Sequence, residues 1–173
     1  ARHLPLDLVL VRKIGVPRQP EVAAGAIVDG APPKVFVNQQ VAKRAGLTEE
    51  TVRKMGQDLL PEIERRKAQY LKGFARPDLA GKTLVVVDDG VATGATLKAS
   101  LQALCEMGPK RIILALPTAP SDTLKTLTQL ADEIICLHQP ELFLSVGTAY
   151  RYFPQVSDKD VIEAMQRSAA SDG

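Results

Sequence analysis

Cysteine, histidine and aromatic residues are scarce in this sequence. Its 173 residues include two Cys, two His and no Trp, and aromatic residues make up only 4%. No Cys/His cluster has the spacing of a zinc site, which excludes that class of metal centre. Both cysteines, Cys105 and Cys136, fall in apolar stretches, so we expect them to pack in the core and not to act in catalysis.

Long apolar runs and strong net charge are missing as well. No eighteen-residue apolar run and no cleavable leader occur, which argues against membrane insertion and secretion and favours a cytoplasmic location. The net charge of +2 is too small to indicate nucleic-acid binding by itself. With 45% hydrophobic residues we expect one domain, residues 1–173, with a core at 6–140 and a C-terminal segment at 140–173.

One stretch organises the chain: residues 84–96, with the sequence LVVVDDGVATGAT. Four apolar residues run into Asp88 and Asp89, and a loop of glycine and threonine follows. A short β-branched run bounded by turn residues predicts a strand buried on both faces, as in a parallel sheet. Leucines then recur with helical spacing up to Gly108, so the stretch is interpreted as strand, loop and helix.

This arrangement suits a phosphorylated sugar. A helix that begins in a Gly/Thr loop presents free backbone N–H groups and the positive end of its dipole to a phosphate. Thr93 and Thr96 add hydroxyl donors. Asp88 and Asp89, at the carboxyl end of the strand, can accept hydrogen bonds from a sugar diol or hold hydrated Mg²⁺. A ligand with a phosphate, a diol and a metal ion is therefore implied.

Two commoner phosphate motifs are absent, namely G-x-x-x-x-G-K-[ST] and G-x-G-x-x-G after a strand. The stretch instead resembles the 5-phosphoribosyl-1-pyrophosphate (PRPP) signature of the type I phosphoribosyltransferases over thirteen consecutive residues. The resemblance implies an α/β fold with a doubly wound, mostly parallel sheet flanked by helices, a hairpin lid and a C-terminal hood. The plainer alternative is an Asp-Asp-Gly turn followed by an ordinary helix cap.

The same resemblance assigns roles within the stretch. Asp88 and Asp89 would hold the ribose 2′- and 3′-hydroxyls and the water shell of Mg²⁺, and Ala92–Thr96 would wrap the 5′-phosphate. The substrate-binding residues implied are Asp88, Asp89, Gly90, Val91, Ala92, Thr93, Gly94, Ala95 and Thr96. Members that act on 6-oxopurines carry an acid where this chain has Ala92, so the likeness is to the adenine, orotate and regulatory members.

In the N-terminal part, residues 6–11 have the pattern of a strand, which Arg12 and Lys13 close. In the family a basic residue near this position faces the pyrophosphate, so Lys13 is a candidate catalytic residue that would neutralise the leaving group. The alternative is a strand-end charge in solvent. The family's earlier strand with an Arg-Gly-Gly pyrophosphate loop is not found, so half of the leaving-group site is expected to be missing.

The next part combines a predicted hairpin with a helical insertion. Short strands at 25–28 and 34–38 predict a hairpin, and residues 15–40 are the best candidate for the family's lid. Within it, Glu21 either contacts substrate or forms a surface salt bridge. Residues 41–72 show an amphipathic pattern that Pro61 interrupts, which predicts a kink or two helices.

Residues after the organising stretch repeat strand and helix: strands at 111–117 and 133–137, with a helix from Ser121 between them. The tail at 140–153 holds four of the seven aromatic residues, where the family builds its hood. Phe143 or Tyr150 could therefore contact a nucleobase, although packing beneath a loop is the simpler account. Residues 157–160 form a capping box for a last helix.

Taken together, these features predict an Mg²⁺-dependent phosphoribosyltransferase. It would transfer the phosphoribosyl group of PRPP to a nitrogen nucleophile, such as a nucleobase, with release of pyrophosphate. The family is usually dimeric, so we expect a homodimer. One alternative is a PRPP- or nucleotide-sensing module that uses the basic run Arg65-Arg66-Lys67 on nucleic acid. Another is a chain that is inactive without a pyrophosphate loop.

Overall fold

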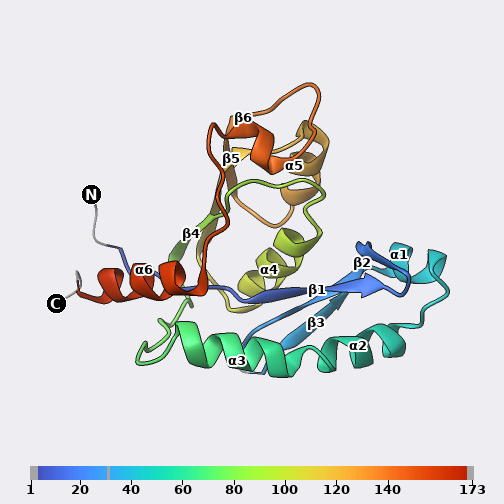
Figure 1. The fold of residues 1–173 in the computed structure, drawn as a ribbon, viewed down its shortest axis with the longest axis horizontal. Helices are drawn as coiled ribbons and strands as arrows, with labels where there is room; N and C mark the ends of the chain where they lie inside the picture. The colour runs from blue at the N-terminus through green and yellow to red at the C-terminus, as the bar shows by residue number, and fades with distance from the viewer. Residues whose placement is uncertain (1–3, 31, 171–173) are drawn as a thin grey trace. The chain divides into compact units, whose positions relative to one another are not determined.

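The computed structural model describes residues 4–30 and 32–170, which form two compact units (Figure 1). Unit 1 comprises the residues up to Asp78 together with those from Gln155 onward, and unit 2 comprises Leu79–Pro154. The predicted division into a core at 6–140 and a segment at 140–173 is not tested by this partition and stays a prediction. Residue 31, in the predicted hairpin, lies outside the described residues.

Unit 1 is built on a three-stranded antiparallel sheet with the order β1-β2-β3. Its strands are β1 (Val11–Val16), β2 (Gln19–Val28) and β3 (Lys34–Val37). Its helices are α1 (Gln39–Arg44), α2 (Glu49–Gln57), α3 (Leu60–Tyr70) and α6 (Asp158–Ala170). The predicted hairpin is confirmed as β2 and β3, whereas its role as a lid stays a prediction.

The first strand differs from the prediction, because it begins at Val11 and residues 4–10 belong to no strand. The ladder with β2 starts at the pair Val11↔Val28. Just before it, Leu10 makes two bonds to Asp29: its N–H donates to Oδ1 at 2.8 Å, and its C=O accepts the Asp29 N–H at 2.9 Å. An apolar run becomes a strand only where another strand offers a ladder, and periodicity cannot show whether one is present.

The amphipathic region predicted at residues 41–72 contains α2 and α3 and part of α1. Asn38 accepts a hydrogen bond from the N–H of Val41, and Thr48 accepts one from the N–H of Thr51, so these two side chains cap the starts of α1 and α2. Pro61 lies in the first turn of α3, which confirms two helices in place of one kinked helix. The amphipathic faces of these helices supply buried residues such as Val52 and Ile63.

Arg76 joins two carboxylates of unit 1. Its guanidinium donates to Asp7 at 3.1 Å, to Asp29 at 2.7 Å and to the carbonyl of Leu8. The Asp29 side chain is fully buried, and that burial raises its pKa, while the charge of Arg76 acts in the opposite direction. Arg76 therefore holds residues 7–8 beside the end of β2.

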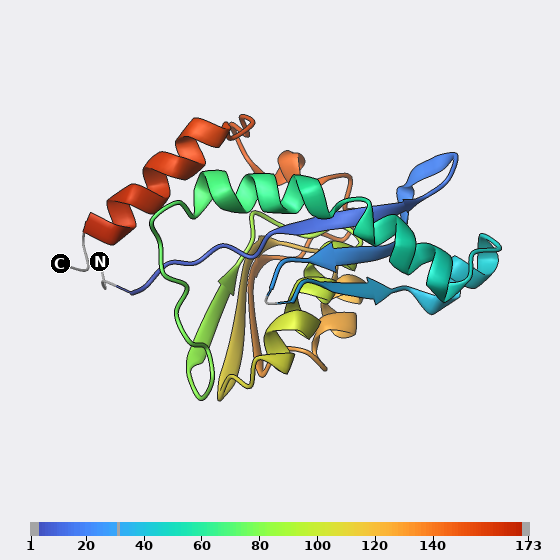
Figure 2. The same cartoon turned by 90° about the horizontal axis from the view of Figure 1, so that it is seen from below.

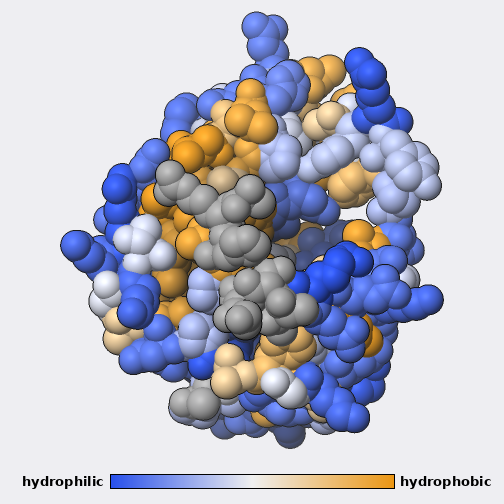
Figure 3. Space-filling model, turned by 90° about the vertical axis from the view of Figure 1, so that its left-hand side faces the viewer, coloured by the Kyte–Doolittle hydropathy of each residue, from blue (hydrophilic) through white to orange (hydrophobic). Residues whose placement is uncertain are grey.

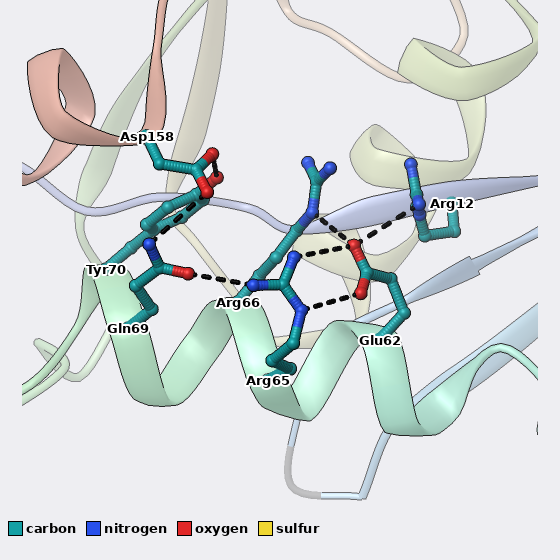
Figure 4. Close-up of polar contacts among 7 residues, drawn as sticks. All are labelled: Arg12, Glu62, Arg65, Arg66, Gln69, Tyr70 and Asp158. Atoms are coloured by element: carbon teal, nitrogen blue, oxygen red, sulfur yellow. Dashed lines mark hydrogen bonds and ion pairs between the residues drawn. The ribbon is translucent and has the colours of Figure 1, made fainter.

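Glu62 on α3 pairs with three arginines (Figure 4). Its carboxylate accepts from Arg12 at 3.3 Å, from Arg65 at 2.8 Å and from Arg66 at 2.8 Å. Hydrogen bonds from Arg65 and Arg66 lower the pKa of Glu62 to about 2. The basic run on α3 is thus partly neutralised by its own helix.

Glu62→Gln is expected to destabilise the protein in a pH-dependent way. Because the folded pKa lies below the ordinary 4.5, Glu62 stabilises the fold above about pH 4.5, and this contribution is lost as the pH falls towards 2. The difference in Tm between the parent and Glu62→Gln should therefore be largest at pH 6 and shrink towards pH 2. Glu64→Gln, which removes a more weakly paired carboxylate of the same helix, is the matched control. A difference independent of pH would contradict the role of Glu62.

Helices α3 and α6 are joined by polar contacts of Asp158, also drawn in Figure 4. Tyr70 donates its hydroxyl to one Asp158 oxygen at 2.5 Å, and Gln69 donates to the other at 3.3 Å. The predicted capping box at the start of α6 is confirmed: Ser157 N–H and Oγ donate to Asp160, and the Asp160 N–H donates back to Ser157 Oγ.

Unit 2 contains a parallel three-stranded sheet with the order β4-β5-β6. Its elements are β4 (Thr83–Val87), α4 (Ala95–Glu106), β5 (Arg111–Thr118), α5 (Ser121–Leu127), β6 (Glu133–His138) and the 3₁₀ turn η1 (Val146–Ala149). Strand and helix alternate as predicted, and the α/β fold class is confirmed. Parallel strands joined by helical crossovers place the loops after β4 and β5 at the same edge of the sheet.

The core of unit 2 lies between one face of this sheet and helices α4 and α5, as Figure 2 allows the reader to follow. Ile112, Leu114 and Leu116 of β5 pack there with leucines of both helices. The prediction that β4 is buried on both faces is wrong, because Val85 and Val87 are 53% and 72% exposed. Both crossover helices cover the same face, so alternate residues of β4 remain accessible.

Many large apolar side chains are exposed, and orange areas mark apolar residues on the face drawn in Figure 3. The expectation for the cysteines also needs correction, since Cys105 is exposed and Cys136 is only half-buried. Cys105 follows the helical period of α4 but lies near its end, beyond the leucines that face the sheet.

Across the described residues, every helix is too short or too polar to cross a membrane.

Candidate functional site

The loop after β4 is shaped by backbone hydrogen bonds to β5. The N–H of Asp88 donates to the carbonyl of Ala115 at 3.4 Å, and the N–H of Val91 donates to the carbonyl of Thr118 at 3.1 Å. Between these two anchors, Gly90 adopts a φ of 147°. The chain thus turns out of the sheet at Asp88–Asp89 and returns at the buried Val91.

Gly90 cannot be replaced without displacing its neighbours. A Cβ at this position would lie 2.8 Å from Cγ1 of Val146 and 3.0 Å from Cγ2 of Thr118. Its φ is also one that side-chain-bearing residues rarely adopt. The glycine therefore permits the tight turn that presents the two carboxylates.

Asp88 and Asp89 are both exposed at this turn. One carboxylate oxygen of Asp88 accepts the N–H of Asp89 at 2.9 Å. Although Asp88 as a residue is exposed, nearby protein atoms partly desolvate its carboxyl, which raises its pKa, and the adjacent charge of Asp89 acts in the same direction. A cation or hydroxyl donors at this position would relieve that unfavourable charge, so the pair is suited to a hydrated metal ion or a diol.

Helix α4 begins directly after this loop, and the N–H groups of its first turn have no partner within the helix. Gly94 precedes the helix with a φ of 73°, and no side chain caps the end. The first bond within the helix runs from the N–H of Lys98 to the carbonyl of Gly94 at 2.8 Å, so the preceding amides of the first turn have no partner inside the helix. Thr93 and Thr96 are exposed beside them. The end offers donors and a favourable dipole for a phosphate.

Helix α5 contacts this loop through Thr123, a residue that the sequence analysis did not single out. Thr123 donates its hydroxyl to the carbonyl of Ala92 at 2.7 Å, and its methyl group lies 3.0 Å from where a Cβ of Gly94 would be. The sequence could have indicated Thr123, because it lies two residues after the predicted helix start at Ser121. That start, like the loop after β4, lies at the carboxyl edge of the sheet. The side chain of Thr123 therefore contacts both Ala92 and Gly94.

The carboxylates of this turn fit Mg²⁺ that keeps most of its water ligands. Within residues 4–30 and 32–170, no group of three or more His, Cys, Asp or Glu side chains is placed to hold a metal ion. The adjacent pair Asp88 and Asp89 suits Mg²⁺ that keeps most of its waters and shares phosphate oxygens of a ligand. A metal held by protein side chains alone would need more carboxylates.

The other predicted site residues lie elsewhere in the chain. Lys13 belongs to unit 1, where its Nζ lies 3.1 Å from a carboxylate oxygen of Glu21, so the surface salt bridge considered for Glu21 is present. The role of Lys13 towards pyrophosphate stays a prediction. Phe143 follows β6 and is half-buried, and its contact with a base is likewise untested. Tyr150 donates its hydroxyl to the backbone carbonyl of Asp89 at 2.5 Å, a contact that spacing along the chain did not predict.

Comparisons with known proteins point to one family. The family described as "Phosphoribosyl transferase domain" matches residues 8–143. Two proteins of Mycobacterium tuberculosis, from strains CDC 1551 / Oshkosh and H37Rv, are each 40% identical over 164 residues and named "Putative phosphoribosyl transferase". The crystal structure of TT1426 from Thermus thermophilus superposes with a TM-score of 0.78 at 30% identity, covering 94% of this chain and 76% of that one.

The coverage is unequal between this chain and its relatives. The aligned region includes 95% of this chain but only 37% of each mycobacterial protein, so the chain spans little more than a third of their length. The family match, by contrast, extends over most of the chain and includes the whole of the 84–96 stretch. The chain belongs to the phosphoribosyl transferase domain family.

Proposed function

We propose that this chain binds PRPP with Mg²⁺ and transfers its phosphoribosyl group to a nitrogen nucleophile. The observation that carries the proposal is the loop at residues 88–96, where exposed carboxylates precede an uncapped helix N-terminus. The membership of the family supports the same reaction class. The 5′-phosphate would bind the N–H groups at the start of α4, and the ribose diol would bind Asp88 and Asp89.

The reaction is a displacement at the anomeric carbon of the ribose. The nitrogen lone pair forms the new C–N bond, the C–O bond to pyrophosphate breaks, and the nitrogen gives its proton to solvent. Asp88 and Asp89 would orient the sugar, and the α4 terminus would fix its far end, so positioning supplies much of the catalysis. Mg²⁺ held through water by the two carboxylates would neutralise charge on the departing pyrophosphate.

No observation favours the nucleic-acid alternative over this proposal. Arg65 and Arg66 both pair with Glu62, and Lys67 lies 3.7 Å from Glu64, so the basic run is paired along its own helix. Ion pairs of this kind are typical of a solvated helix face. The acceptor of the transfer is proposed only as a nitrogen nucleophile, with a nucleobase as the first class to screen.

Titration calorimetry of the purified chain tests the proposal. We expect ribose 5-phosphate to bind, because it carries both the phosphate and the diol, and PRPP with Mg²⁺ to bind more tightly if the pyrophosphate is also contacted. Equal affinity for the two ligands would mean that this chain holds the ribose phosphate but not the pyrophosphate, and release of pyrophosphate should then be undetectable with any nucleobase. If neither ligand binds, the proposed function is wrong.

A further inference from the structure

The segment after β6 folds back onto the turn that carries the two carboxylates. We call residues 146–153 the tail latch, which consists of η1 and the aromatic residues that follow it. Val146 packs against Gly90, with Cγ1 only 2.8 Å from where a Cβ of that glycine would lie. Tyr150 donates its hydroxyl to the carbonyl of Asp89. The latch therefore contacts the peptide between Asp89 and Gly90 through both packing and a hydrogen bond.

The tail latch is held by contacts within it and with Ser145, the residue just before it. The carbonyl of Ser145 accepts both the N–H and the hydroxyl of Thr148, at 3.3 and 2.6 Å, and the N–H of Tyr150 donates to the carbonyl of Gly147 at 3.2 Å. The rings of Tyr150 and Phe153 pack with their centroids 4.8 Å apart. These contacts restrict the Tyr150 ring, so its hydroxyl is held in position for one acceptor.

The acceptor, the carbonyl of Asp89, is part of the Asp89–Gly90 peptide. The hydrogen bond from Tyr150 therefore restrains the orientation of that peptide. Gly90 has a φ of 147°, a conformation with no intrinsic preference strong enough to keep the turn in one state. The carboxylate of Asp89 belongs to the residue just before this glycine. A hydrogen bond to the Asp89 carbonyl therefore limits the rotations that would move the carboxylate away from a bound diol.

We propose that Tyr150 is a positioning residue that holds the Asp89 carboxylate for the ribose diol through the backbone carbonyl of Asp89. This inference rests on the proposed function, because it concerns the same ribose-binding turn. The phosphate end of the ligand depends on different anchors, namely Thr123 and the start of α4. Loss of the Tyr150 hydroxyl should therefore affect ligands with a diol and spare those with only a phosphate.

The test compares Tyr150→Phe with the matched substitution Tyr152→Phe, since Tyr152 is 80% exposed. Titration calorimetry with ribose 5-phosphate should show affinity weakened about five- to tenfold in Tyr150→Phe, the effect of one hydrogen bond. Affinity for inorganic phosphate should stay within about twofold of the parent, consistent with the intact α4 terminus. Amide exchange at Gly90 and Val91 should accelerate in Tyr150→Phe, while Tyr152→Phe should match the parent in every measurement.

The outcomes separate this inference from the proposed function. If the parent chain binds ribose 5-phosphate and Tyr150→Phe binds it equally well, the positioning role is wrong and the proposed function stands. Equal weakening for ribose 5-phosphate and for phosphate would also overturn the positioning role, because it would indicate a general effect on folding. Absence of ribose 5-phosphate binding by the parent would overturn the proposed function, and the positioning role with it.

Discussion

Replacing Asp88 and Asp89 together by asparagine is expected to weaken ribose 5-phosphate and PRPP binding by at least about tenfold. Hydrogen bonds to charged groups contribute roughly 1.5–3 kcal/mol each, and this substitution removes the charge from the two proposed acceptors of the diol. The Mg²⁺ dependence of PRPP affinity should disappear as well, because the neutral amides are poor ligands for this hard cation. Titration calorimetry with and without Mg²⁺ measures both effects.

Unfolding will not explain that loss. Because the folded pKa of Asp88 is raised, its ionised form opposes folding, and the free energy of unfolding falls as the pH rises through that pKa. Removing the charge should therefore leave Tm at neutral pH unchanged or higher than in the parent. Glu141→Gln, at an exposed position of the same unit, controls for the change in net charge. Unchanged PRPP affinity in the double variant would show that the carboxylates do not bind the sugar or the metal.

Arg76→Met is expected to cause the largest loss of stability, about 3–5 kcal/mol in the free energy of unfolding. The Asp29 carboxyl is fully buried, and Arg76 is the cation that pairs with it at 2.7 Å. Without Arg76, the ionised carboxylate would remain buried, and among the described residues the N–H of Leu10 would still donate to it. Urea unfolding followed by circular dichroism, with amide exchange across β1 and β2, measures the change.

The pH dependence of Arg76→Met provides a check on the cause. Burial already raises the pKa of Asp29, and removal of Arg76 should raise it further, so protonation of the folded state becomes easier. The variant should therefore regain stability as the pH falls through this raised pKa. Adding Asp29→Asn to Arg76→Met should restore part of the stability, whereas Arg53→Met, at an exposed pair, should cost well under about 1 kcal/mol. Equal losses for Arg76→Met and Arg53→Met would refute the role of burial.

Local chemistry explains why much of the fold was predictable. The elements from β4 to β6 follow the order and approximate bounds expected from apolar runs, helical spacing and turn residues. Asn38, Thr48 and the Ser157–Asp160 box act within three residues of their own positions, so their caps can be recognised without tertiary information. Pro61 similarly marks the start of α3 because proline favours the first turn of a helix.

Other features depended on what lies next to each segment. Residues 6–10 have the pattern of a strand, yet the ladder begins only at Val11. Val85 and Val87 have the composition of buried residues but remain exposed, because α4 and α5 cover the opposite face of their sheet. Pattern measures the tendency of a segment to be buried, whereas burial itself requires a partner that no local window contains.

The candidate site shows the same division between local and distant information. The carboxylates, the glycine turn and the uncapped helix start are contiguous at residues 88–96, so their order along the chain already specifies strand, loop and helix with acids at the strand's carboxyl end. Their support comes from Thr118, Thr123 and Tyr150, which are up to 61 residues away in sequence. Hydrogen-bond partners at such separations follow from how parallel strands align their loops, and only the folded arrangement decides which hydroxyl reaches which carbonyl.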